Sequence, residues 1–476
     1  MINEGIIFTL FGASGDLAKR KLYPALYQLF LKKHLPDSFV LLGSARREWS
    51  NQHFREVIAE SIHQARLDAR QLSHFMKHCY YISHNASLKE DYPQLKAKLD
   101  ELAHNYQAPN RIFYLSLAPE LFPTISRYLK EEAIMSSNGF NRLVIEKPFG
   151  YNQASADQLQ KQLCQSFEEE QIFRMDHYLG KSIVNQILPI RQDNPIFRQL
   201  WQPEWLDHIQ ISLNEDLGVA GRAGYYEQAG VARDMIQNHA LQLLTLVTLS
   251  LDQSSMDSDT LRQRKIQILD HLKLADPPID HVVRGQYSAN SDLNLPSYRQ
   301  EDQVDPQSQV ETFLAFKAEI DLPEWQGVPI YIRSGKALSQ KQTDIKLIFK
   351  NQHEALLSNF FQIKIAPDPH FNLQLNQQDS WSQHQWQPLN LEYRLKQEHL
   401  AQIPSDYEKL ILDCIEGNLS SFAHALEVKY AWRFIDQIRQ TFTKKGLPLH
   451  SYPAASRGPE AAYQLLQKDH RHWIND

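Results

Sequence analysis

The chain has 476 residues, of which 42% are hydrophobic and 22% are charged, as expected for a soluble globular protein with two domains. Lys and Arg number 50 and Asp and Glu number 56, so the formal net charge is −6. This balance gives no electrostatic reason to expect a nucleic acid or an anionic membrane as a partner.

Short apolar runs alternate with longer amphipathic runs in the first third of the chain. Strands are predicted at residues 6–10, 39–42, 111–117 and 142–145, and a helix at 19–31. Alternation of strands with helices indicates a parallel sheet with crossover helices.

A glycine-containing turn joins the first predicted strand to the first helix. It consists of Gly12, Ala13, Ser14, Gly15, Asp16 and Leu17. Glycines let the backbone approach a phosphate closely, and a helix N-terminus presents free N–H groups to it. The spacing lacks the first glycine step of G-x-G-x-x-G, so an ordinary strand-to-helix turn explains this segment about as well.

Two cations follow strands of the predicted parallel sheet. Arg46 stands where sites that prefer NAD usually carry an acid, and it suits the 2′-phosphate of NADP. We therefore expect NADP as the cofactor, with NAD as the weaker alternative. Lys147 precedes Pro148, which would hold the ammonium at the carboxyl edge of the sheet, where ligands bind. A surface lysine beside a turn is an equally good explanation.

Four reactive side chains lie close together between residues 174 and 181: Asp176, His177, Tyr178 and Lys181. If a helix begins here, His177 and Lys181 project from the same face. Cationic and neutral donors together suit a dianionic phosphate, whereas Asp176 has the wrong charge and is expected to serve another group. Taken alone, the run is explained at least as well by a solvated charged turn.

Beyond residue 180 the pattern changes to partial period-two alternation between turns. Strands are predicted at 205–213, 310–320, 328–333, 344–349 and 389–395, and helices at 229–251, 407–414 and 427–442. This pattern favours a mainly antiparallel sheet with one face covered and the other free for a partner. The polar segment 252–305 is predicted as helix plus loop.

The helix predicted at 229–251 carries the most specific motif. On an α-helix, Asp234, Asn238 and Gln242 form one row, with His239 alongside Gln242. So apolar a helix should be buried, and buried polar groups need partners or a ligand. Four converging polar groups favour a functional site over a lone core histidine.

Three further residues follow predicted strands of the second part. Glu215 can offer a carboxylate to sugar hydroxyls, and Lys336 and Lys341 place two ammonium groups beyond the strand at 328–333. Each of these residues, taken alone, has an ordinary surface explanation.

The three cysteines, Cys79, Cys164 and Cys414, are far apart and lack metal-ligand spacing. One of them would be unpaired in any disulfide scheme, which favours a reducing compartment. The chain begins without a signal-peptide pattern, and no segment has the length of a membrane span. We therefore expect a cytoplasmic protein without a membrane partner or a metal site.

Taken in order, several segments resemble the glucose-6-phosphate dehydrogenase family: GASGDLAKRKLYP, GSARR, FYLSLAP, RLVIEKPFG, RMDHYLGK, RDMIQNHALQ, GVPIYIRSGKAL and DYEKLILD. The resemblance spans about residues 8–459. It implies an α/β Rossmann-type dinucleotide-binding domain, which we place at 1–178, and a larger β+α domain with a mainly antiparallel open sheet at 179–476. It also implies NADP-linked oxidation of glucose 6-phosphate at C1 to 6-phosphogluconolactone, in a homodimer or a tetramer built as a dimer of dimers.

The resemblance also implies roles for individual residues. His239 is the general base, and Asp176 pairs with it. The 6-phosphate is bound by His177, Tyr178 and Lys181, with Lys336 and Lys341 reaching the substrate from another loop. The sugar hydroxyls are bound by Lys147, Glu215 and Asp234. The cofactor is bound by Gly12, Ala13, Ser14, Gly15, Asp16, Leu17, Lys19 and Arg46, and Lys147 also faces it.

Some positions depart from the family pattern, such as Ala220 in the place of a usual glutamate and Leu426 in the place of a usual acid. They leave fine cofactor contacts and an accessory NADP site open. Two alternative functions also remain. A sugar dehydrogenase of the glucose–fructose oxidoreductase type would act on an unphosphorylated sugar, which the phosphate-type run disfavours. A non-catalytic NADP-binding regulator would have no chemical reason to keep both Asp176 and His239.

Overall fold

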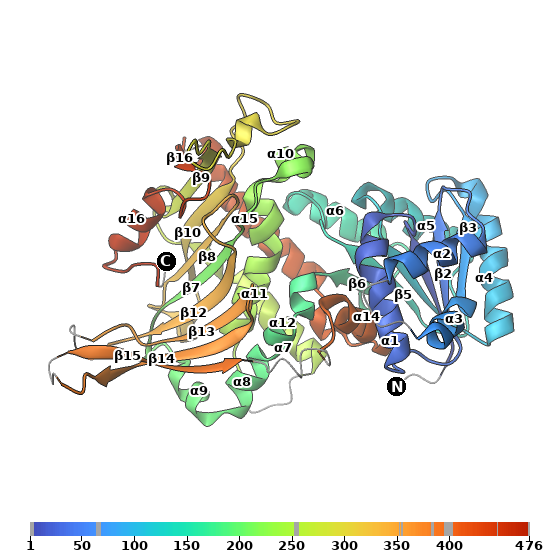
Figure 1. The fold of residues 1–476 in the computed structure, drawn as a ribbon, viewed down its shortest axis with the longest axis horizontal. Helices are drawn as coiled ribbons and strands as arrows, with labels where there is room; N and C mark the ends of the chain where they lie inside the picture. The colour runs from blue at the N-terminus through green and yellow to red at the C-terminus, as the bar shows by residue number, and fades with distance from the viewer. Residues whose placement is uncertain are drawn as a thin grey trace.

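The structure is a computed structural model that describes residues 4–62, 68–251, 257–351, 353, 356–381, 385–394, 403–444 and 446–474. Two β-sheets lie toward opposite ends of the molecule (Figure 1). Helices α14 (Asp406–Glu416) and α15 (Ala425–Lys444) lie in the region between them, although both come from the last fifth of the chain.

The N-terminal sheet has six strands within the described residues, in the order β3-β2-β1-β4-β5-β6, and every pairing is parallel. The strands are β1 (Ile6–Phe11), β2 (Phe39–Ala45), β3 (Cys79–Ser83), β4 (Asn110–Leu115), β5 (Asn141–Glu146) and β6 (Ile172–Met175). The predicted parallel sheet is confirmed. The strand order reverses between β1 and β4, and in open sheets of this type a crevice for a dinucleotide forms at that point.

Helices connect these strands across the two faces of the sheet. They are α1 (Tyr23–Leu31), α2 (Asn51–Ser61), α3 (Ala69–Lys77), α4 (Tyr92–Tyr106), α5 (Phe122–Glu131) and α6 (Gln153–Leu163), together with the π-helical η1 (Ala18–Leu22) and the short η2 (Lys89–Asp91), η3 (Pro119–Leu121) and η4 (Glu169–Gln171). The predicted helix at 19–31 is therefore η1 followed by α1.

The second sheet has ten strands in the described part of the chain, in the order β15-β14-β13-β12-β7-β11-β10-β9-β16, with β8 paired to β10. The strands are β7 (Leu206–Asn214), β8 (Leu272–Leu274), β9 (Val282–Ser288), β10 (Phe313–Ile320), β11 (Ile330–Gly335), β12 (Gln342–Phe349), β13 (Phe360–Ala366), β14 (His370–Gln378), β15 (Trp386–Arg394) and β16 (Leu449–Pro453). Within this sheet, only the β7–β11 and β9–β16 pairings of the described strands are parallel, so the predicted mainly antiparallel sheet is confirmed.

The prediction of helix plus loop for residues 252–305 is partly wrong. Residues 252–256 lie outside the described residues, and α12 (Ser258–Asp270) follows them, but the segment then forms β8 and β9. β9 pairs with β10 on one side and with β16 on the other. These non-local pairings determine its conformation, because β propensity depends strongly on the neighbouring strands.

The π-helical η7 (Ala232–Ala240), α11 (Leu241–Thr248), α12 and α15 lie on one side of the second sheet, and α16 (Ala461–Gln467) lies on its opposite side (Figure 1). The other helices of this part are α7 (Ser182–Asn185), α8 (Ile187–Asp193), α9 (Pro195–Leu200) and α10 (Ala223–Val231), and the short turns are η5 (His177–Gly180), η6 (Ala220–Arg222), η8 (Pro278–Asp280), η9 (Tyr298–Gln300), η10 (Pro323–Trp325) and η11 (Leu419–Ser421). None of the described helices combines the length and the hydropathy that a membrane crossing requires.

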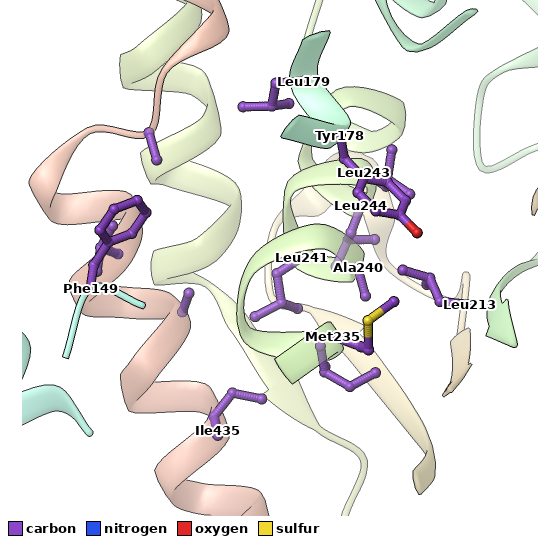
Figure 2. Packing of buried hydrophobic residues seen from close by; sticks show 14 of the residues in the cluster. Phe149, Tyr178, Leu179, Leu213, Met235, Ala240, Leu241, Leu243, Leu244 and Ile435 are labelled. Carbon is purple, nitrogen blue, oxygen red and sulfur yellow. The ribbon is translucent and has the colours of Figure 1, made fainter. Parts of the chain in front are cut away.

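The continuous helix formed by η7 and α11 lies inside the main hydrophobic core. Every residue of α11 is buried. Figure 2 shows Met235, Ala240 and Leu241 of this helix between Leu213 of β7 and Ile435 of α15. Apolar packing on both sides therefore fixes the position of the helix that carries His239.

A buried ion pair joins two helices behind this core. Lys265 of α12 and Glu427 of α15 are 1% and 0% exposed, with 2.8 Å between Nζ and Oε2. Gln242 Nε2 donates to the same carboxylate oxygen at 2.9 Å. Removing one member of such a pair leaves the other charge buried and uncompensated.

We expect Lys265→Met to lower the free energy of unfolding by about 3–5 kcal/mol, measured by urea denaturation. Lys273→Met is the matched control, because Lys273 and Asp321 form an exposed pair at 3.2 Å, and exposed pairs contribute about 1 kcal/mol or less. The double variant with Glu427→Leu should recover much of the lost stability. Equal losses in the two lysine variants would contradict the importance of burial.

Candidate active site

His239 lies on η7, where the helix is π-helical rather than α-helical. Residues five apart lie on one side of a π-helix, and such segments occur often at functional sites. Asp234 and His239 therefore face the same ammonium: Lys147 Nζ lies 2.8 Å from His239 Nε2 and 3.8 Å from Asp234 Oδ1. The predicted row of Asp234, Asn238 and Gln242 is wrong, because Gln242 turns away to Glu427.

A glycine makes the entry into this helix possible. Gly230 has φ +61°, and a Cβ there would lie 2.3 Å from Glu311 Oε1. Only glycine accommodates both the left-handed backbone and the close carboxylate. The kink at Gly230, one residue before the end of α10, thus sets the direction in which η7 continues and presents His239.

Asp176 and His239 form a buried pair. His239 Nδ1 lies 2.6 Å from Asp176 Oδ1, and the two side chains are 1% and 2% exposed. Because Nδ1 faces a carboxylate and Nε2 faces an ammonium, the neutral ring carries its proton on Nδ1 and its free lone pair on Nε2.

The electrostatics keep this pair in the form Asp⁻–His⁰. Burial lowers the pKa of His239, the Asp176 carboxylate opposes this shift, and Lys147 reinforces it, so the net direction is down from the ordinary value of 6.5. Burial alone would raise the pKa of Asp176, but the His239 ring and its hydrogen bond outweigh that and lower it. His239 is therefore available as a proton acceptor at neutral pH.

Within the run at 174–181, only His177–Gly180 is helical, as the 3₁₀ turn η5, so the expectation that a helix places His177 and Lys181 on one face is wrong. Asp176 directly follows β6 and caps η5 by accepting a hydrogen bond from the Tyr178 N–H at 2.9 Å. Gly180 closes the turn against α14, since a Cβ there would lie 2.4 Å from the Asp406 carbonyl oxygen. This close backbone contact and the Asp176 cap together hold η5 as a short turn.

The side chains of η5 surround the imidazole of His239. The Tyr178 ring stacks on it with 4.1 Å between centroids, and the His177 ring meets it edge-on at 4.7 Å. Lys181 lies further out and forms an ion pair with Asp406 at 3.0 Å. Asp406 was not predicted as a site residue from the sequence, where its only signal was its place in the segment DYEKLILD.

Lysines and carboxylates alternate beside this pair. Lys336 follows β11 and contacts both Glu215, after β7, and Asp234 Oδ2, the latter at 3.3 Å. Asp234 in turn faces Lys147. Lys341 lies exposed before β12 and takes no part in these ion pairs.

Asp176, His177 and His239 place one potential metal-ligand atom each within 4.8 Å of one another. However, the Nδ1 atom of His239 is engaged by Asp176, and its Nε2 atom faces the Lys147 ammonium. A metal ion at Nε2 would have to displace this cation. The arrangement therefore fits a proton acceptor better than a metal ligand.

The turn after β1 leaves room only for glycine at its first position. Gly12 has φ +84°, and a Cβ there would lie 2.1 Å from the Ser116 carbonyl oxygen, at the end of β4. The N–H groups of Gly12 and Ala13 donate to the Ser44 carbonyl oxygen at 2.9 and 3.2 Å, which joins the turn to the end of β2. Arg46 follows β2 and is exposed at this same edge of the sheet. A narrow glycine turn with an arginine beside it fits the phosphates of a dinucleotide.

The sequence is similar to known proteins over nearly its whole length. A family model described as the NAD binding domain of glucose-6-phosphate dehydrogenase matches residues 9–186, and one described as its C-terminal domain matches residues 188–474. The glucose-6-phosphate 1-dehydrogenase of Streptococcus pneumoniae is 41% identical over 481 residues, which cover 99% of this chain and 97% of that protein. The enzyme of the same name from Bacillus subtilis is 39% identical over 98% of both chains.

Solved structures agree with this similarity. A glucose-6-phosphate dehydrogenase in complex with its substrate glucose-6-phosphate matches with a TM-score of 0.91 and 31% identity, covering 100% of this chain and 99% of that one. The glucose-6-phosphate 1-dehydrogenase of Mycobacterium avium matches with a TM-score of 0.85 and 27% identity, again covering 100% and 99%. The matches include both sheets and the segments that carry the Asp176–His239 pair. The chain is therefore a member of the glucose-6-phosphate dehydrogenase family, with a nicotinamide dinucleotide-binding domain at its N-terminus.

Proposed function

We propose that this protein oxidises glucose 6-phosphate at C1 to 6-phosphogluconolactone and transfers the hydride to NADP. The observation that carries the proposal is the imidazole of His239, whose Nδ1 is held by Asp176 and whose Nε2 faces the Lys147 ammonium. A free base beside several cations suits a sugar that carries both a weakly acidic hydroxyl and a phosphate.

His239 and Asp176 are the catalytic residues of the proposal. His239 Nε2 accepts the proton of the C1 hydroxyl, and the Asp176 carboxylate stabilises the imidazolium that forms. Lys147 Nζ now lies within hydrogen-bond distance of Nε2, so a C1 hydroxyl would take its place there and leave the ammonium to bind a neighbouring sugar oxygen. A bound nicotinamide dinucleotide supplies the hydride acceptor.

The remaining side chains bind and orient the substrate. We assign the binding of the 6-phosphate to His177, Tyr178 and Lys181. Lys336 and, at greater distance, Lys341 would contact the substrate from the opposite loop. Glu215 and Asp234 are assigned to the sugar hydroxyls with Lys147. Fixing the phosphate at a distance from C1 holds the reacting carbon in place, which lowers the entropic cost of the reaction.

The cofactor is assigned to the edge of the N-terminal sheet. The turn of Gly12, Ala13, Ser14, Gly15, Asp16 and Leu17, with Lys19 behind it, would hold the pyrophosphate. Arg46 would bind the 2′-phosphate and so favour NADP over NAD, while Lys147 reaches the site from β5.

We expect Arg46→Ala to raise the KM for NADP by about tenfold or more, because a hydrogen bond between charged groups contributes about 1.5–3 kcal/mol. The KM for NAD should change little, because NAD lacks the 2′-phosphate. Arg47→Ala is the matched control, since the Arg47 guanidinium packs over Trp49 with 5.7 Å to the ring centroid. An equal effect of Arg46→Ala on both cofactors, in steady-state assays, would contradict the assignment.

Assembly and location complete the proposal. Exposed apolar side chains of β15, Leu391 and Tyr393 among them, support a homodimer or a tetramer built as a dimer of dimers. The three free cysteines support a reducing, cytoplasmic location.

We place the division between the two domains at residue 178, two residues after Asp176 and within η5.

One spectrophotometric assay tests the proposed reaction. Reduction of NADP and of NAD is followed with glucose 6-phosphate and with free glucose as substrates. We expect fast reduction of NADP with glucose 6-phosphate and very slow reduction with glucose. Comparable rates with both sugars would favour a sugar dehydrogenase that acts on an unphosphorylated substrate. Tight NADP binding without turnover would favour a non-catalytic NADP-binding regulator.

A further inference from the structure

The first turn of α14 connects three separate parts of the molecule through three consecutive residues. Asp406 pairs with Lys181 after η5, and Glu408 pairs with Lys32 at the end of α1, at 2.6 Å between Nζ and Oε2. Tyr407 forms a hydrogen bond with Glu146, the residue before Lys147. α14 thus contacts the phosphate-type run, the first helix of the dinucleotide-binding domain and the end of β5 (Figure 1).

This turn holds the Asp406 carboxylate in place. Ser405 caps α14, and a capping box with Glu408 satisfies two of its free N–H groups. A carboxylate in the first turn is also stabilised by the helix dipole. The backbone of Asp406 packs against Gly180, where no Cβ would fit. Asp406 is therefore anchored by its helix.

Lys181 is open to solvent, as its partner is. It stands between η5 and α7 and extends over the face of Tyr178, with 5.3 Å from Nζ to the ring centroid. The side chains of Lys181 and Asp406 are 24% and 32% exposed, so both are accessible to a dissolved anion. An incoming phosphate would meet a lysine that is already neutralised by a carboxylate.

We propose that Asp406 is a specificity-determining residue that competes with the phosphate of the substrate for Lys181. The proposal rests on the assignment of Lys181 to the phosphate under the proposed function. A phosphate dianion can outcompete one carboxylate because it carries more charge and more acceptor oxygens, whereas a neutral sugar cannot. Asp406 thereby sets the affinity for phosphorylated sugars below the value that the lysines alone would give.

The test is Asp406→Asn, which preserves size and removes the charge. We expect the KM for glucose 6-phosphate and the inhibition constant of inorganic phosphate to fall by about two- to fivefold, as the loss of a partly exposed ion pair predicts. The change in kcat should be smaller than the change in KM. Asp259→Asn, which removes a first-turn carboxylate from α12 instead, should leave both constants unchanged.

A double-variant cycle separates competition from a structural effect. In the Lys181→Ala background, Asp406→Asn should change neither constant, because the two residues act through one contact. A persisting effect, or an unchanged or raised KM in the single variant, would overturn the proposal. Calorimetric titration with inorganic phosphate needs no turnover, so a protein inactive on glucose 6-phosphate would refute the proposed function while the Asp406 comparison still gives its own answer.

Discussion

Replacing His239 by asparagine is expected to lower kcat for glucose 6-phosphate by between about 10² and 10⁴-fold, because asparagine cannot accept the C1 hydroxyl proton. The KM should stay within a few-fold of the wild-type value, since the residues proposed to bind the phosphate remain. Steady-state kinetics with NADP measure both constants.

The chain offers a matched control for this variant. His208 of β7 is also a buried histidine paired with an aspartate, at 2.5 Å from its Nδ1 to Asp207 Oδ2, and it is 4% exposed. His208→Asn therefore reproduces the loss of a buried histidine from a His–Asp pair without touching the site. If both variants lost kcat equally, His239 would be a structural histidine. Loss of substrate binding without loss of kcat would also contradict its role as the base.

The second large effect is expected for Asp176→Asn, which should lower kcat by about 10²-fold or more. The asparagine preserves the shape of the side chain but neither stabilises an imidazolium nor selects the Nδ1–H tautomer as a carboxylate does. Asp176 is 2% exposed and touches His239 directly, so no solvent would replace the lost charge.

The pH dependence of this variant gives a separate test. As the proposed base, His239 must be neutral, so kcat/KM is expected to rise as the pH passes upward through the pKa of His239. Burial places that pKa below 6.5 in the wild type, and the Asp176 carboxylate raises it against this trend. Without Asp176 the pKa falls further, so the acid limb of the profile should move to lower pH. A limb that stays in place or moves to higher pH would mean that another group titrates.

Much of the fold followed from local patterns. Period-two and helical spacing predicted the parallel sheet of the first part and the mainly antiparallel sheet of the second. Short or polar strands such as β6, β8 and β9 were not predicted, because their conformation depends on neighbouring strands. The polar row on the predicted α-helix was wrong for a related reason: the change from i, i+4 to i, i+5 bonding along η7 accompanies the kink at Gly230 and packing in the core.

The candidate site followed from the sequence only in part. The types of residue were recognisable, as was the fact that Asp176 did not suit a phosphate. Resemblance to a family supplied the pairing of Asp176 with His239. The contact between Lys181 and Asp406, 225 positions apart in the chain, had no local signal.

The sequence by itself determined the two kinds of sheet, the glycine turn after the first strand and the family, because these depend on short-range periodicity and on the order of motifs. Only the tertiary structure decided which charges meet. It placed Asp176, at the end of β6, 2.6 Å from His239 on η7, set Lys147 against the other ring nitrogen, and neutralised Lys181 with Asp406. The physical reason is that charges interact through space, and packing of η7, α11 and α14 between the two sheets fixes those distances.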